Sequence, residues 1–242
     1  MQPDIAWLTV RQLLTRGKLL VLVVLGALPV LLALLYTFSD STVGPQTFLV
    51  GTYTDFAYTV VVPITALVFA AAVLGSELED GTIVYLLLKP VARWQIVASK
   101  LVPTIAVIAA FVTISIYATA IVLDRGVGEA HVAFAFALGA VLGGAAYAAL
   151  FTFLGLMTSR ALIGGLLYVF IWEGLITNLF AGARNWSIRE YMNGIADSFS
   201  TLPIDVFEAP LSGGRSLVSC IVVVVVFTLL SVNRLRTINL AG

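Results

Sequence analysis

The sequence predicts an all-α integral membrane protein with six transmembrane helices. Of its 242 residues, 60% are hydrophobic and 11% are charged, whereas a soluble domain carries about 25% charged residues. The mean hydropathy is +1.06, and six apolar runs approach or exceed the roughly 20 residues that a helix needs to cross a bilayer. These runs cover residues 19–38, 56–75, 101–123, 132–156, 162–180 and 217–232. We therefore expect residues 1–242 to form one transmembrane domain.

A short amphiphilic lead-in, residues 1–18, precedes the first apolar run. Trp7, Val10 and Leu14 fall on one helical face, with Arg11 and Arg16 off it. This spacing predicts an interfacial helix that lies along the membrane before the first span. A frayed tail with basic residues is the alternative. The first run is too long for a signal-peptide core of about 7–15 residues, so we expect it to be a retained span.

Residues 76–100 form the main polar stretch, between the second and third spans. Three carboxylates end the second span, a Gly-Thr pair suits the start of a new helix, and residues 83–88 form an apolar segment too short to cross the membrane. The stretch predicts a short helix along the inner face, with acids at one end and bases at the other. An ordinary charged loop is the alternative. The polar and turn-forming residues are Glu77, Glu79, Asp80, Gly81, Thr82, Lys89, Pro90, Arg93 and Lys100.

Glu173 is the one acidic residue well inside an apolar run. An ionisable side chain within a membrane span is costly and indicates a functional role, here in a substrate pathway or in gating. Because Glu173 lies toward the outer end of the fifth span, an interaction with interfacial water or with a partner helix is the alternative.

Residues 181–215 form the longest segment between spans. From Ser187 onward the apolar residues recur with helical spacing, and Ser187 with Glu190 matches a capping box, in which each residue satisfies a backbone donor of the other. We expect an outer amphipathic helix that ends by Pro203 and either lies on the outer leaflet or covers a cavity. Its apolar face comprises Ile188, Tyr191, Met192, Ile195, Phe199 and Leu202.

The basic residues predict the orientation, because Lys and Arg are retained on the cytoplasmic side. With both termini in the cytoplasm, residues 76–100 are cytoplasmic and residues 181–215 are outside. The inner segments then hold Arg11, Arg16, Lys18, Lys89, Arg93, Lys100, Arg160, Arg234 and Arg236, and the outer segments hold only Arg125, Arg184, Arg189 and Arg215.

Several classes of function are excluded by composition. The formal net charge is zero, so the chain has no net positive charge that would favour binding to nucleic acid. The single cysteine, Cys220, is expected to be an inert thiol, and the single histidine, His131, has no metal-binding partners nearby in the sequence. The scattered acids form no catalytic or metal-binding set. Gly139 and Gly143 form a small-xxx-small pattern in the fourth span, which predicts close helix packing within the chain or across a dimer.

The polar stretch resembles a known family. The order Glu77-x-Glu79-x-Gly81-Thr82, Leu86-Leu87, Pro90-Val91-x-Arg93 and then Lys100, after the second of six spans, is similar to the membrane subunits of ABC transporters of the ABC-2 class. Position 92 is Ala, where that family often has Ser or Thr. The lead-in, the six spans and the long outer segment also resemble that architecture, so the resemblance covers nearly the whole chain.

The resemblance implies a permease whose residues 77–93 are a coupling helix that seats on an ABC ATP-binding subunit. Two such ATPase subunits, with their ATP and Mg, and a second permease copy or a paralogue would complete an exporter in a prokaryotic plasma membrane, among membrane lipid. This chain has no phosphate-binding loop of its own: Gly17-Lys18 is followed by Leu19, and Gln12 stands where the first glycine is needed. No cofactor is therefore expected in this chain.

Two other classes are the alternatives to a permease. An ion-gradient-driven secondary transporter would use Glu173, although such proteins place ionisable or broken-helix sites between two repeats, and no repeat is evident. A membrane-embedded enzyme would need a catalytic constellation. The sparse intramembrane charge favours an apolar or amphiphilic substrate over an ion or a polysaccharide.

Overall fold

The computed structural model describes residues 8–11, 13, 15–79, 91–123 and 130–237. Within these ranges the chain forms helices and no strand, and six helical segments are long and apolar enough to cross a membrane. The expected all-α membrane fold is therefore confirmed. The helices are α2 (Arg16–Thr37), α3 (Pro45–Gly51), η1 (Thr52–Val61), α4 (Val62–Glu79), α6 (Arg93–Leu123), α7 (Ala130–Met157), α8 (Ala161–Leu167), η2 (Tyr168–Ile176), α9 (Thr177–Leu179), η3 (Ala181–Trp186), α10 (Ile188–Phe199) and α11 (Gly213–Thr237).

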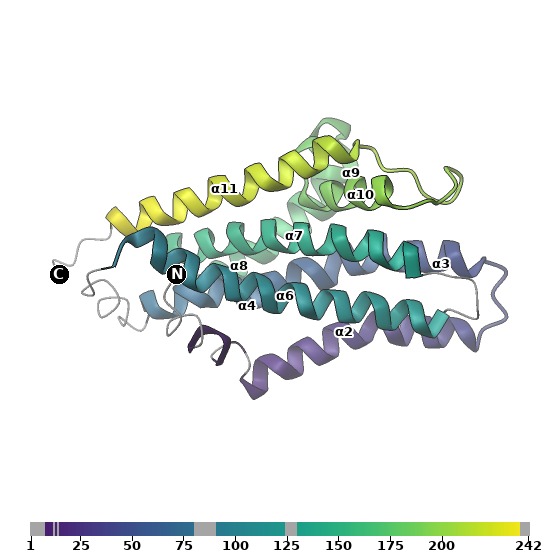
Figure 1. Ribbon diagram of the computed structural model, residues 1–242, viewed down its shortest axis with the longest axis horizontal. Coiled ribbons are helices and arrows are strands. Elements are labelled where there is room, and N and C mark those ends of the chain that lie inside the picture. The colour runs from purple at the N-terminus through teal and green to yellow at the C-terminus, as the bar shows by residue number, and fades with distance from the viewer. Residues whose placement is uncertain (1–7, 12, 14, 80–90, 124–129, 238–242) are drawn as a thin grey trace.

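The spans alternate in direction along one elongated bundle (Figure 1). The C-terminus of α4, the N-terminus of α6 and the C-terminus of α11 lie together at one end, which we call the terminal end. Helices α3, α9 and α10 lie at the other, which we call the loop end. Among the described residues, Arg93 begins α6, Arg160 precedes α8 and Arg234 lies near the end of α11, so all three lie toward the terminal end. The side of the membrane on which this end lies stays a prediction.

Helix α7 is the centre of the bundle and contacts α4, α6, α10 and α11. Its sequence is apolar on every side and rich in Ala and Gly, a composition typical of a buried helix. A Cβ atom added at Gly155 would lie 2.5 Å from the backbone oxygen of Ala71 on α4. Glycine is therefore needed at this crossing, because only it lets the two backbones come so close.

The second span begins earlier than the sequence indicates. The second apolar run begins at residue 56, yet the helix starts at Pro45 and continues through α3 and η1 into α4. Proline at the first helical position has its φ angle already fixed for a helix. Polar threonines lower the hydropathy of this stretch, but Leu49 and Tyr53 are buried. The third span likewise begins at Arg93, before residue 101.

The lead-in is described only in part. Residues 8–11 and 13 are helical, and Thr9 and Leu13 are buried against the rest of the chain. Residues 1–7, 12 and 14 lie outside the described residues, so Trp7 and Leu14, which define the expected interfacial face, do too.

Candidate functional site

The polar stretch joins α4 to α6 at the terminal end. Helix α4 ends at Glu79 and α6 begins at Arg93, and these two helix ends lie near one another in the bundle (Figure 1). The side chains of Glu77 and Glu79 lie outside the description. So do Asp80, Gly81, Thr82, Lys89, Pro90 and the short helix expected over residues 83–88. The structure shows that α4 and α6 hold the two ends of this stretch.

Lys100 lies inside the bundle. Its side chain is only 2% exposed, and its Nζ donates a hydrogen bond of 3.2 Å to the backbone oxygen of Val73 on α4. It therefore joins α6 to α4 and presents no ammonium on the surface. A second cation at this end, Arg234 on α11, donates from Nε to the Leu156 oxygen in the last turn of α7 at 3.4 Å. Cations that bind carbonyls at a helix C-terminus also interact favourably with the helix dipole.

Glu173 joins the fifth span to α10. Its carboxylate is 1% exposed and accepts three hydrogen bonds: from the Tyr168 hydroxyl at 3.0 Å, from the Ile188 amide at 2.9 Å and from the Ser187 hydroxyl. Ile188 is the first residue of α10, so Glu173 satisfies a free donor at the N-terminus of that helix. The positive end of the helix dipole favours a carboxylate at this place.

The capping box expected at Ser187 and Glu190 is half formed. The Ser187 hydroxyl accepts a hydrogen bond from the Glu190 amide at 3.2 Å, as expected. The Glu190 carboxylate does not reach back to Ser187. It accepts instead from Arg189 at 3.2 Å and from Asn193 at 3.3 Å, and the Ser187 amide bonds to the oxygen of Arg184. Arg189 and Asn193 thus take the place of the Ser187 amide as donors to the Glu190 carboxylate.

Helix α10 packs against the transmembrane helices α7 and α11 as well as η1. Ile188, Tyr191, Met192 and Ile195 of the expected apolar face are buried. Phe199, the last residue of α10, is exposed, and Leu202 lies beyond the helix and is half-buried.

The glycine pair of α7 receives α10. A Cβ at Gly139 would lie 2.7 Å from the Met192 oxygen, and one at Gly143 would collide with the Met192 side chain. The small-xxx-small pattern therefore serves packing within the chain. Tyr191, on the neighbouring face of α10, donates to the Asn185 oxygen at 2.6 Å. Burial raises the pKa of this hydroxyl above its ordinary value.

Two arginines extend the joint between the fifth span and α10. Arg189 donates to Asn178 at 3.2 Å and to the Glu190 carboxylate, and Arg184 donates from Nε to the Thr177 oxygen at 3.4 Å. From the sequence, both residues were predicted only as basic residues of the outer segments. No local motif marks these contacts, because Arg184 and Thr177 are 7 residues apart in the chain, and Arg189 and Asn178 are 11 residues apart.

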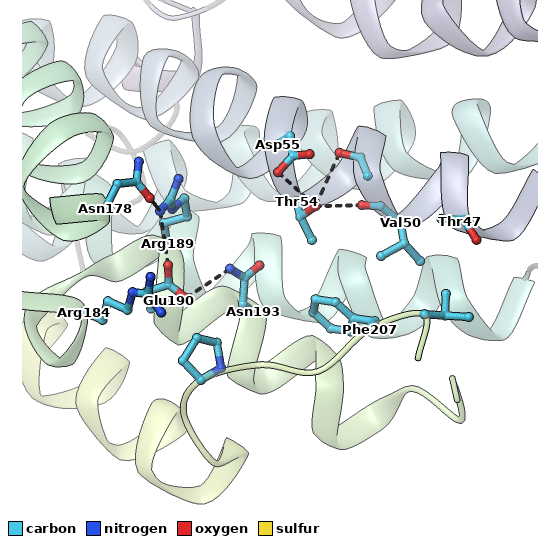
Figure 2. A pocket seen from close by; sticks show the side chains of 13 residues that line it. Thr47, Val50, Thr54, Asp55, Asn178, Arg184, Arg189, Glu190, Asn193 and Phe207 are labelled. Carbon is cyan, nitrogen blue, oxygen red and sulfur yellow. Dashed lines mark hydrogen bonds and ion pairs between the residues drawn. The ribbon is translucent and has the colours of Figure 1, made fainter. Parts of the chain in front are cut away.

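A polar pocket of about 400 Å³ lies at the loop end beside this joint. Figure 2 shows Thr54 and Asp55 of η1 along one side, and Arg184, Arg189 and Glu190 of η3 and α10 along another. η1 is π-helical and contacts η2, the π-helical segment that carries Glu173. Such turns recur at functional sites. Glu173 is not among the lining residues, so the expected role in a pathway is not supported by this pocket.

The remaining candidates are the possible metal ligands and the single cysteine and histidine. No group of three His, Cys, Asp or Glu side chains there is placed to hold a metal ion. Cys220 is buried, and His131 is exposed at the start of α7.

Comparison with protein families matches most of the chain. The family model described as "ABC-2 family transporter protein" matches residues 14–183, well over half of the chain. The matched region runs from the lead-in through the polar stretch to η3, and so includes Glu173. A comparison with curated proteins gives no match.

Proposed function

The chain belongs to the ABC-2 family of transporter proteins, and on that premise we propose that it is the permease half of an ATP-driven exporter. The family is one of multi-pass membrane subunits and implies an ABC ATPase as partner. In our proposal two ATPase subunits bind ATP and Mg, two permeases line the pathway, and both termini face a prokaryotic cytoplasm. The second permease is another copy or a paralogue.

The observation that carries the proposal is the anchoring of the polar stretch. Its two ends continue directly into α4 and α6, and both helices contact α7 at the centre of the bundle. The hydrogen bond from Lys100 to Val73 joins α4 and α6 beside this stretch. A displacement of residues 77–93 by the ATPase would therefore move α4 and α6 together. The coupling residues in this proposal are Glu77, Glu79, Asp80, Gly81, Thr82, Lys89, Pro90 and Arg93, and Lys100 is a positioning residue.

The ATPase acts by preferring one permease conformation. To move a two-state equilibrium from about 1:99 to 99:1, its binding must favour one state by about 5.5 kcal/mol. Closure of an ATPase pair on ATP is the source of that preference, and α4 and α6 transmit it to the loop end.

Glu173 is proposed as the joint of the outer gate. A carboxylate that holds the N-terminus of α10 to the fifth span makes the two elements move together. Movement of α8 and η2 relative to α7 would then displace α10 from Gly139 and Gly143, and open the loop end. An apolar or amphiphilic substrate suits the few charges within the spans.

The test is co-purification from native membranes in mild detergent, followed by an ATPase assay. We compare the tagged wild-type chain with a double variant, Glu79→Lys with Arg93→Glu. The matched control is Arg160→Glu, which reverses an exposed cation at the terminal end outside the polar stretch. We expect an ABC ATPase to accompany the wild type and the control, and to be lost or uncoupled in the double variant.

Two results would contradict the proposal. If no ATPase accompanies the wild-type chain, the partner is wrong, and transport driven by an ion gradient through Glu173 becomes the hypothesis to test. If the control loses the ATPase as readily as the double variant, the polar stretch is not the docking surface.

A further inference from the structure

The pocket at the loop end contains one ion pair, Arg189 with Glu190, and two further charges of opposite sign, Asp55 and Arg184, that form no ion pair in the described part of the chain. Within the described residues, Asp55 forms no ion pair, and its carboxylate accepts only a long hydrogen bond of 3.4 Å from Thr54. Arg184 likewise forms no ion pair there, and its one hydrogen bond, from Nε to Thr177, leaves the terminal N–H groups of the guanidinium available. The two residues come from η1 and η3, and both line the pocket.

Two buried polar atoms belong to the same lining. The Nε of Arg189 and the Oδ1 of Asn193 have no hydrogen-bond partner in the described part of the chain. The amide nitrogen of Asn193 is occupied by Glu190, as the dashed line in Figure 2 shows. A buried donor or acceptor without a partner costs about 1–3 kcal/mol. A polar occupant that orders this lining would remove part of that cost.

The position of the pocket relative to the membrane indicates the source of its ligand. The chain beside Arg184 exposes Phe180 and Trp186, which are 63% and 73% exposed, and the Trp172 indole donates to the Trp186 oxygen at 3.2 Å. Exposed aromatic residues next to the end of a span are typical of the membrane interface, at the level of the lipid headgroups. We therefore place the pocket at the level of the lipid headgroups. On the orientation that the basic residues favour, this is the outer leaflet.

We infer that this pocket binds a zwitterionic phospholipid headgroup, with the phosphate at Arg184 and a primary ammonium at Asp55. Guanidinium and phosphate pair in a bidentate manner, and a carboxylate beside hydroxyl groups suits an ammonium with three donors. A quaternary ammonium fits less well, because such groups are held in aromatic cages, and Phe207 is the one aromatic ring in the lining. Ethanolamine phosphate is thus the preferred headgroup. The inference concerns binding by this chain alone and does not depend on an ATPase.

The experiment measures lipid retention by the purified full chain. Detergent-solubilised protein is incubated with phosphatidylethanolamine, phosphatidylcholine or phosphatidylglycerol, and bound lipid is counted by native mass spectrometry over a range of lipid concentrations. The pocket variants are Arg184→Gln and Asp55→Asn. Their matched controls, Arg215→Gln and Asp40→Asn, alter exposed charges at the same end of the bundle that do not line the pocket.

We expect phosphatidylethanolamine to bind most tightly, and each pocket variant to weaken it by about tenfold, the loss expected for one charged contact. The controls should bind like the wild type. Equal retention of all three lipids, or loss through Arg184→Gln alone, would overturn the zwitterion assignment in favour of an unselective surface or an anion site. Soluble O-phosphoethanolamine is the second probe. If it binds as tightly as the lipid, the assignment to a membrane lipid is wrong.

Discussion

Replacing Glu173 tests whether it is a structural joint. The Glu173→Ala variant would remove the acceptor of three buried donors: the Ile188 amide and the hydroxyls of Tyr168 and Ser187. Each unsatisfied donor costs about 1–3 kcal/mol. The amide cannot turn away, whereas the hydroxyls rotate and recover part of their loss. We therefore expect a total loss of about 3–5 kcal/mol.

The glutamine variant separates hydrogen bonding from charge. In Glu173→Gln, the remaining oxygen still accepts from the Ile188 amide and from Tyr168, and the new amide donates to the Ser187 oxygen. What is lost is the attraction between the carboxylate and the N-terminus of α10, about 0.3–1 kcal/mol. Glutamine should therefore be close to wild type, and alanine far from it.

Thermal unfolding of the detergent-purified chain is the assay. For a chain of this size, 1 kcal/mol shifts the Tm by about 2–4 °C, so Glu173→Ala should unfold roughly 6–20 °C below the wild type and Glu173→Gln within about 4 °C of it. Glu208→Ala, which removes an exposed carboxylate at the same end, should leave the Tm unchanged. If Glu173→Ala matches the wild type, or if alanine and glutamine destabilise equally, Glu173 is not the joint described above.

Three further predictions concern the packing of α7 and the link between α4 and α6. Gly155→Ala places a methyl group 2.5 Å from a backbone oxygen of α4 and should cost about 1–3 kcal/mol; Gly17→Ala, in open space, should show no such loss of Tm. Gly143→Ala should be partly rescued by Met192→Ala, with a coupling energy of about 1 kcal/mol in a double-mutant cycle of Tm values, whereas additive effects would contradict the contact. Lys100→Met removes a charge-assisted hydrogen bond worth about 1.5–3 kcal/mol and should lower the Tm without releasing a bound ATPase; release at an unchanged Tm would place Lys100 at the docking surface.

The membrane architecture follows from the sequence because hydropathy is a local property. A run of about 20 apolar residues has one low-energy solution in lipid, a helix that satisfies its own backbone. Residues 132–156, for example, lie entirely within α7, Ala130–Met157. The start of α10 was also predicted from the sequence, because serine is a preferred helix-capping residue. In the structure the Ser187 hydroxyl accepts a hydrogen bond from the Glu190 amide.

Helix ends with mixed composition were harder to predict. The stretch before Phe56 carries several threonines and an aspartate, so hydropathy left it outside the second apolar run. In the fold, Leu49 and Tyr53 are buried there, and Tyr53 donates to the Ile116 oxygen on α6 at 2.8 Å. This contact with α6 stabilises the helical turn, and a local window of sequence around Tyr53 does not include Ile116.

The sequence alone determined that this chain spans a membrane six times and which residues are too polar to lie in lipid. Only the tertiary structure decided what those polar residues do. Lys100 became a link inside the bundle, Glu173 a cap on α10, and Asp55 and Arg184 two sides of one pocket. The reason is physical. Hydropathy is a property of each residue and its neighbours in the sequence, whereas a hydrogen bond needs a partner. The partners of these residues are distant in the sequence and come close in space only when the helices pack.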